Sequence, residues 1–203
     1  MSQQRFISVL ARYFPEKTTS YCVKLWEEKP FDIIVTKKRS TKLGDYSFST
    51  KNKRHKITIN GDLNPYSFLV TYIHEVAHYR TYLEYGFKVK PHGSEWKDLF
   101  SRLMHPLLNE SIFPAQMLPA LQNYFSNPKA SSCSDLALLK ALRLQDKKEE
   151  DLFLSEIPIG STFLLKDRAF MKEEKRRTRS LCREIASGKK YYISEGAFVE
   201  LVK

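Results

Sequence analysis

Two histidines four residues apart enclose a glutamate in the segment His74-Glu75-Val76-Ala77-His78. On an α-helix, residues four apart lie on the same face, so both imidazoles can bind one metal ion. Imidazole nitrogens are common ligands of zinc, and a carboxylate beside such a site can take a proton from a metal-activated water. The pattern therefore predicts metal-assisted hydrolysis, with a peptide bond as the expected substrate and Glu75 as the general base.

A single helix must carry these residues. Asn64-Pro65 is a typical helix start, and Gly86 is a plausible stop. Apolar residues of this segment fall within one arc of roughly 140° on a helical projection, and His74 and His78 lie opposite that arc. We therefore expect an amphipathic helix with its apolar arc in the core and its histidines facing a groove. The alternative is an ordinary solvated face that carries two histidines. The apolar arc comprises Pro65, Phe68, Leu69, Tyr72, Ile73, Val76 and Leu83.

A catalytic zinc usually has three protein ligands and one open position. The best third ligand is His92, which follows His78 by 14 residues and stands just after Lys90-Pro91. A second helix is predicted directly after it, because Trp96, Leu99, Phe100 and Leu103 repeat at helical spacing. In this prediction Ser94 caps that helix, and His92 sits at its entrance on a turn that can fold back over the first helix.

Other ligands for the third position remain open. Glu95 could bind as a carboxylate and His105 is also available, although His105 is expected to cap the end of the second helix. A plain surface histidine at position 92 is the structural alternative. The HExxHxxGxxH metalloproteases are excluded, since Thr81 and Glu84 occupy the places of their glycine and third histidine. His55 lies in a basic run and is expected to be exposed.

The two motifs together resemble the SprT-like domain, in which HExxH is followed by His-Gly-x-x-[Phe/Trp]; here the second motif reads His92-Gly93-Ser94-Glu95-Trp96. That family includes proteases that cleave proteins crosslinked to DNA. The resemblance covers approximately residues 1–108. It implies one Zn²⁺ bound by His74, His78 and His92, with Glu75 as the general base. It also implies an α+β, minimal zincin-like domain, in which a small antiparallel sheet packs on helices.

Many bacterial members of that family end in a zinc ribbon built on paired cysteines. This chain has only Cys22, Cys133 and Cys182, and no CxxC pair. We therefore expect one zinc site, no ribbon and no disulfide framework, which suits a reducing compartment. The first ten residues lack the apolar block of a signal peptide and no segment reaches transmembrane length. The expected location is cytoplasmic, without a membrane partner.

Positive charge is the second informative feature, with 34 Lys and Arg against 23 Asp and Glu. Residues 1–62 alone hold 13 basic and 6 acidic residues, around predicted strands at 31–36 and 56–60 and a turn-strand segment at 43–48. Such a basic rim can neutralise phosphates, so we expect nucleic acid, most readily DNA, as a partner besides the protein substrate. An ordinary solvated surface is the alternative. The expected contacts here are Lys37, Lys38, Arg39, Lys53 and Arg54.

The C-terminal third divides into two parts. Residues 111–150 are predicted to form a helical extension and linker after a catalytic domain at 1–110. Residues 151–203 contain short apolar runs and glycines, which predict a small basic β module of three or four strands. Between two of its strands stand further expected nucleic-acid contacts, Lys175, Arg176, Arg177 and Arg179. Tyr191 and Tyr192 could add a stacking face, although burial of one of them within a strand is expected.

The sequence therefore predicts a zinc peptidase that acts on proteins bound or crosslinked to DNA. Two other functions stay open. One is a nucleic-acid-binding protein that keeps zinc only for structure, in which Glu75 would be silent. The other is a regulatory zinc peptidase that cleaves one soluble partner without DNA.

Overall fold

The computed structural model describes residues 3–39, 41–129, 135–148 and 151–202. The chain forms two compact units, residues 1–130 and 131–203. Each contains both helix and sheet, which confirms the mixed α+β class. The proposed boundaries after residues 110 and 150 stay predictions. Helix α6, which falls in the predicted extension, belongs to the second unit, whereas α5 belongs to the first.

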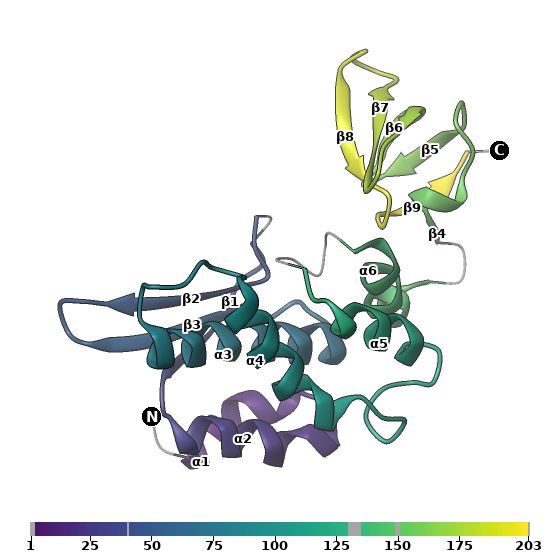
Figure 1. Cartoon of the computed structure of the whole chain (residues 1–203). Helices are drawn as coiled ribbons and strands as arrows, with labels where there is room; N and C mark the ends of the chain where they lie inside the picture. The colour runs from purple at the N-terminus through teal and green to yellow at the C-terminus, as the bar shows by residue number, and fades with distance from the viewer. Residues whose placement is uncertain (1–2, 40, 130–134, 149–150, 203) are drawn as a thin grey trace. The chain divides into compact units, whose positions relative to one another are not determined.

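The first unit surrounds one long central helix, α3. Figure 1 shows α3 between a three-stranded sheet and the α1–α2 pair, with α4 alongside it. Its helices are α1 (Gln3–Leu10), α2 (Thr19–Glu28), α3 (Pro65–Tyr85), α4 (Ser94–Met104) and α5 (Leu118–Ser126). Its strands are β1 (Asp32–Thr36), β2 (Gly44–Ser49) and β3 (Arg54–Asn60).

The sheet of the first unit has the order β1-β3-β2. Strand β2 pairs antiparallel with β3, as expected for a hairpin, but β1 pairs parallel with β3. The prediction of an antiparallel sheet was therefore wrong for one of the two pairings. The chain leaves β1, runs through β2 and returns in β3, so the first and third strands point the same way. Strand β2 is left at the sheet edge, beside α3.

Helix α3 begins and ends as its sequence signals predict. The side chain of Asn64 accepts a hydrogen bond from the backbone N–H of Ser67, and Gly86 follows the last turn with φ of +63°. The middle of the predicted apolar arc is buried, whereas Pro65 and Leu83 at its ends are exposed. Most of the remaining helix surface is buried too, including Thr71 and several other residues outside the arc. The predicted amphipathic helix is therefore a central helix covered on several sides.

Aromatic contacts fix the helices around α3. The Phe6 ring of α1 stacks on Trp26 of α2 at 5.0 Å and meets the buried Tyr72 of α3 edge-on at 6.4 Å. On another side, Phe100 of α4 contacts Phe125 of α5 at 4.9 Å. Helix α5 thus extends the core around α4, as the helical pattern of its sequence predicted. Phe100 also meets the ring of His74 on α3 edge-on at 5.3 Å, so the same aromatic cluster joins α4 to α3.

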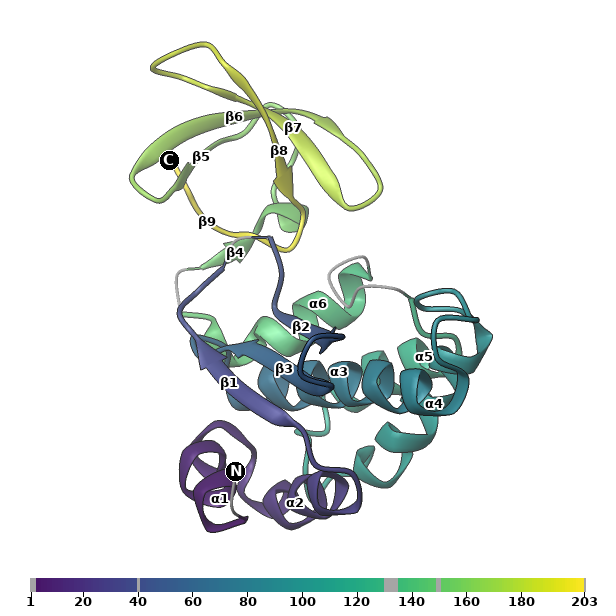
Figure 2. The same ribbon diagram turned by 90° about the vertical axis from the view of Figure 1, so that its left-hand side faces the viewer.

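In the part of the chain that the structure describes, the second unit comprises a curved sheet and one α-helix, α6 (Leu136–Arg143) (Figure 2). Within the described residues the sheet has six strands rather than the predicted three or four, in the order β4-β9-β5-β6-β7-β8. Short apolar runs and turns mark each strand too briefly for its boundaries to be counted from sequence. The strands are β4 (Leu152–Phe153), β5 (Thr162–Leu165), β6 (Arg168–Lys175), β7 (Arg179–Glu184), β8 (Lys190–Ser194) and β9 (Phe198–Leu201).

The core of the β unit combines apolar residues with a buried ion pair. Phe163, Phe170 and Cys182 are among its buried apolar residues. Beside them Lys172 and Glu195 lie 3.3 Å apart with side chains 2% and 0% exposed. The ammonium group of Lys172 also donates to the carbonyls of Leu154 and Ile157 at 2.7 and 3.1 Å. These hydrogen bonds join the segment after β4 to β6, and none of the groups that make them is a metal ligand.

The cysteines and the helices bear on two expectations, the absence of a disulfide framework and the absence of a membrane-spanning segment. Cys22 and Cys182 are buried free thiols, and Cys133 lies outside the described residues. Burial raises the pKa of both thiols, which disfavours the reactive thiolate form at neutral pH. Among the described residues, none of the helices has the length and apolar character needed to cross a lipid bilayer.

Candidate metal centre

Three histidines converge at one point in the first unit. His74 and His78 lie one turn apart on α3, and their Nε2 atoms are 3.2 Å apart. The Nε2 atom of His92 lies 2.9 Å from that of His78 and 3.3 Å from that of His74. Among the described residues, these three form the group of side chains that could hold a metal ion. The structure thus brings together the three predicted ligands.

His92 reaches the helix from a tight turn. The backbone N–H of Gly93 donates to the carbonyl of Lys90 at 2.9 Å, which closes a four-residue turn with Pro91 in its second position. His92 in the third position has φ of +59°, a backbone conformation that residues other than glycine rarely adopt. Such strain persists where the position of a side chain matters for function. The turn directs the imidazole back toward α3.

The spacing of the three nitrogens fits a tetrahedral metal. Zinc-nitrogen bonds are about 2.0–2.1 Å long, so two imidazole nitrogens on one tetrahedral zinc are about 3.3 Å apart. The observed separations of 2.9–3.3 Å are close to that value. Three neutral imidazoles and no thiolate form a donor set that suits zinc and leaves a fourth position for water or substrate. Glu95 and His105, the alternatives for the third ligand, are not in the group.

Trp96 supports all three imidazoles. Its ring is fully buried, with its centroid 4.7 Å from that of His74, 5.1 Å from His78 and 4.6 Å from His92. The first turn of α4 positions it, but Ser94 does not cap that helix as predicted. Gly93 holds the cap position and the hydroxyl of Ser94 donates to Glu95, because the helix starts at Ser94, one residue earlier than predicted.

The environment keeps the imidazoles neutral, as metal binding requires. Burial first, and then the neighbouring His78 and His92, lower the pKa of His74 to about 2. Burial and His92 lower the pKa of His78 to about 3, against an opposing effect of Asp45. Burial also lowers the pKa of His92. All three nitrogens are therefore free to bind a metal at neutral pH.

Glu75 is buried between α3 and the edge strand β2. Its side chain is 6% exposed, and the backbone of Tyr46 hydrogen-bonds to it. Burial, followed by the nearby charge of Asp45, raises the pKa of Glu75 to about 8, although the Tyr46 bond acts in the opposite direction. A carboxyl group with a pKa near neutrality can both accept and return a proton, which is the property of a general acid-base catalyst.

Two residues of the site escaped the sequence reasoning. Gly44 packs so closely on α3 that a Cβ atom there would lie 2.6 Å from Oε1 of Glu75 and 2.7 Å from Cγ2 of Thr71. Asp45 lies near enough to raise the pKa of both Glu75 and His78. The segment Leu43-Gly44-Asp45 looks like a simple turn in the sequence. Only the pairing of β2 with β3 places it over the metal-binding helix.

Three polar side chains that could stabilise an oxyanion, those of Tyr46, Tyr79 and Arg80, make hydrogen bonds to other groups. The hydroxyl of Tyr79 donates to the carbonyl of Pro30, and Arg80 donates to the carbonyl of Leu25 and to Glu28. The hydroxyl of Tyr46 is 2.9 Å from Nδ1 of His55. His55 itself is only partly exposed, so the prediction that it is exposed was wrong. It stacks on Phe48 and contacts Tyr79 and Tyr82, because its strand faces α3.

The predicted nucleic-acid contacts of the first unit differ in their surroundings. Lys37, Lys38 and Lys53 are exposed, and Lys38 pairs with Asp62 at 3.1 Å. Arg54 is exposed and pairs with Asp32 at 3.1 Å. Arg39 instead points into the fold, where it donates to Asn60, Thr58 and the carbonyl of Leu43. Its first role is to hold the connection between β1 and β2.

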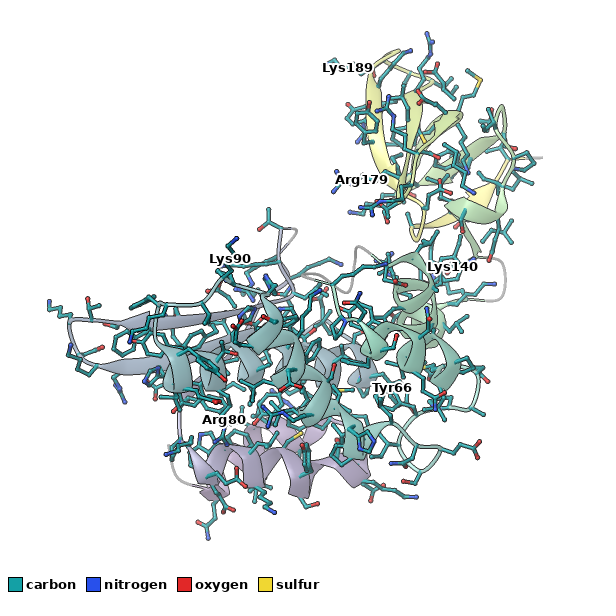
Figure 3. The ribbon with its side chains drawn as sticks, viewed as in Figure 1. Tyr66, Arg80, Lys90, Lys140, Arg179 and Lys189 are labelled. Atoms are coloured by element: carbon teal, nitrogen blue, oxygen red, sulfur yellow. The ribbon has the colours of Figure 1, made fainter. Side chains whose placement is uncertain are left out.

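The predicted contacts of the second unit lie together. Lys175 ends β6, Arg176 and Arg177 form the connection, and Arg179 begins β7; all four are exposed. Arg179 projects from the β unit in Figure 3. The structure therefore gathers these side chains at one hairpin of the second unit.

Comparison with known proteins identifies one family. The model of the SprT-like family matches residues 4–119, a range that contains the three histidines, Glu75 and the sheet. No curated protein and no solved structure matches the chain.

Proposed function

We propose, from the premise that this chain belongs to the SprT-like family, that it is a zinc peptidase acting on proteins bound or crosslinked to DNA. Membership of this family suggests a metallopeptidase-type function. The observation that carries the proposal is the convergence of His74, His78 and His92, with Nε2 atoms within 3.3 Å of one another beside the buried Glu75. In the proposal the three histidines hold one Zn²⁺.

Zinc bound there would polarise the scissile carbonyl group and lower the pKa of the attacking water toward neutrality. In the proposed reaction, Glu75 accepts the proton of that water on a carboxylate oxygen as the oxygen attacks the carbonyl carbon. The C–N bond then breaks, and Glu75 returns the proton to the leaving nitrogen. The products are a carboxylic acid and an amine, and Glu75 ends the cycle unchanged. Trp96 and the turn at His92 keep the three imidazoles in place.

Gly44 offers a test that separates the position of Glu75 from metal binding. Gly44→Ala would place a methyl group 2.6 Å from Oε1 of Glu75, so that the carboxyl group must move. We expect kcat/KM for a peptide substrate to fall at least about tenfold, because small displacements of a catalytic group are costly. Zinc content, measured by atomic emission, should stay at the wild-type value.

The matched control is Gly61→Ala, whose methyl group would meet Cγ1 of Val35 at a similar 2.7 Å, away from the histidines. It tests whether a steric clash alone lowers activity. Equal losses in the two variants, each corrected for its folded fraction, would contradict the positioning role of Gly44.

Charge supports a DNA-bound substrate. The net charge is +11, and exposed cations occur in both units, among them Lys37 and Lys53 near the sheet and Lys175 and Arg177 in the β hairpin. Cations of this kind neutralise phosphates and release counterions, so binding should weaken steeply with salt. A peptidase with such a surface would meet its protein substrates on nucleic acid.

Cleavage of a basic DNA-binding protein, with and without DNA, tests this proposal. We expect cleavage to rise at least about tenfold when DNA holds enzyme and substrate together, because tethering raises the effective concentration. Equal cleavage without DNA would favour a DNA-independent regulatory peptidase. Absence of cleavage by zinc-loaded protein, with DNA binding intact, would favour a nucleic-acid-binding protein with a structural zinc.

A further inference from the structure

We propose that the β unit binds single-stranded nucleic acid by stacking a base on Tyr192. This inference deepens the nucleic-acid part of the proposed function and rests on it. The surface concerned is the outer face of β6, β7 and β8, hereafter the Tyr192 face. It consists of Tyr192, Leu181 and Arg176 with the cations around them.

The sheet register separates the two neighbouring tyrosines. Tyr191 pairs with Cys182, which is buried in the core, and the Tyr191 ring packs edge-on against Phe170 at 5.8 Å. Tyr192 pairs with Leu181 and points to the opposite face, because successive side chains of a strand alternate. Its side chain is 53% exposed. Tyr191 is therefore partly buried against the core, and Tyr192 is the more exposed of the two rings.

Arg176 holds a cation over the Tyr192 ring. The guanidinium carbon lies 5.2 Å from the ring centroid, and Glu174 fixes the same group through an ion pair at 3.2 Å. Leu181 is partly buried beside the ring, as its cross-strand partner. A planar ring with an apolar neighbour and a fixed guanidinium provides a platform on which a nucleobase can stack while its phosphate meets a cation.

The charge around the platform is strongly positive. Residues 173–190 contain seven lysines and arginines against three acidic residues, Glu173, Glu174 and Glu184. Arg183 and Lys190 are partly neutralised, since both pair with Glu173. Figure 3 shows Arg179 and Lys189 toward opposite ends of the unit. Within the described part of the chain, no ion pair is found for four of these basic residues: Lys175, Arg177, Arg179 and Lys189.

These features favour a single strand over a duplex. A stacking ring contributes only when a base is free to leave its neighbours, and bases inside a duplex are already stacked. Cations along the neighbouring strands can follow one phosphate backbone over several nucleotides. An acidic peptide would satisfy the cations but would leave the Tyr192 ring without a planar partner.

The test measures binding of the full chain to a fluorescein-labelled oligo-dT of about 15 nucleotides by anisotropy, with an equal-length duplex and oligo-U alongside. We expect tighter binding to the single strand than to the duplex. Tyr192→Ala should weaken it about tenfold or more, and Tyr192→Phe, which keeps the ring, should bind within about threefold of wild type. The slope of log affinity against log salt should not change in either variant.

Charge variants provide the matched comparison. Arg177→Ala should lower the salt slope by about one, whereas Lys166→Ala, an exposed lysine of the β5–β6 turn, should leave affinity unchanged. Oligo-U distinguishes RNA from DNA as the preferred strand. Wild-type affinity in Tyr192→Ala, or equal binding to duplex, would overturn the stacking site. Displacement of the oligonucleotide by a polyglutamate peptide whose binding depends on Tyr192 would also overturn the stacking site. Absence of binding to every oligonucleotide would refute the nucleic-acid part of the proposed function as well, while leaving zinc and peptidase measurements unaffected.

Discussion

Glu75→Gln should leave a protein that holds its zinc and hydrolyses no peptide bond. Glutamine matches glutamate in shape but cannot accept a proton, so the attacking water loses its base. We expect kcat to fall by about 10²–10⁴-fold, the usual contribution of a general base. The loss should appear with a peptide substrate and with a DNA-bound protein alike, because both depend on the same proton transfer. Continuous fluorescence assays with a quenched peptide measure it.

Glu84→Gln is the matched control, since Glu84 is an exposed glutamate on the same helix. It should retain wild-type kcat. If Glu75→Gln keeps substantial activity in a preparation free of contaminating proteases, Glu75 is not the base and the assignment fails.

The raised pKa of Glu75 predicts that Glu75→Gln does not lower the stability of the folded protein. Burial raises the folded-state pKa to about 8, above the ordinary value near 4.5. Between these values the unfolded chain ionises Glu75 while the folded, metal-free chain does not, so ionisation favours the unfolded state as pH rises. Glutamine removes that cost. The metal-free variant should therefore unfold at neutral pH no earlier than metal-free wild type, as measured by thermal denaturation.

Much of the site follows from local sequence signals. Helical spacing places His74 and His78 together, and Asn64-Pro65 and Gly86 delimit the helix that carries them. The position of His92 follows from the family motif rather than from spacing alone, because a turn at Lys90-Pro91 could direct the histidine elsewhere. Its positive φ is visible only in the structure.

What the sequence does not reveal depends on contacts between distant segments. The close approach of Gly44 to Glu75 requires β2 to lie at the sheet edge over α3. The parallel pairing of β1 with β3 likewise depends on where the chain returns after β2. Basic runs predict charge but not its use, so Arg39 gave the same signal as its exposed neighbours although it donates hydrogen bonds inside the fold.

His92→Ala should lose the metal and, with it, all peptidase activity. The variant leaves two imidazoles on α3, and two nitrogen ligands bind zinc far more weakly than three in a preformed site. We expect zinc affinity to fall by more than about hundredfold, since even loss of a group that only supports a ligand costs 10–100-fold. His105→Ala removes an exposed histidine outside the cluster and should behave as wild type.

The decisive measurement is the zinc content of wild type, His92→Ala and His105→Ala after loading with zinc and dialysis against a weak chelator. The proposed site requires one zinc per chain in wild type and in His105→Ala, and close to none in His92→Ala. One zinc per chain in folded His92→Ala would show that His92 is not a ligand. Absence of stoichiometric zinc in folded wild type would contradict the metal centre itself.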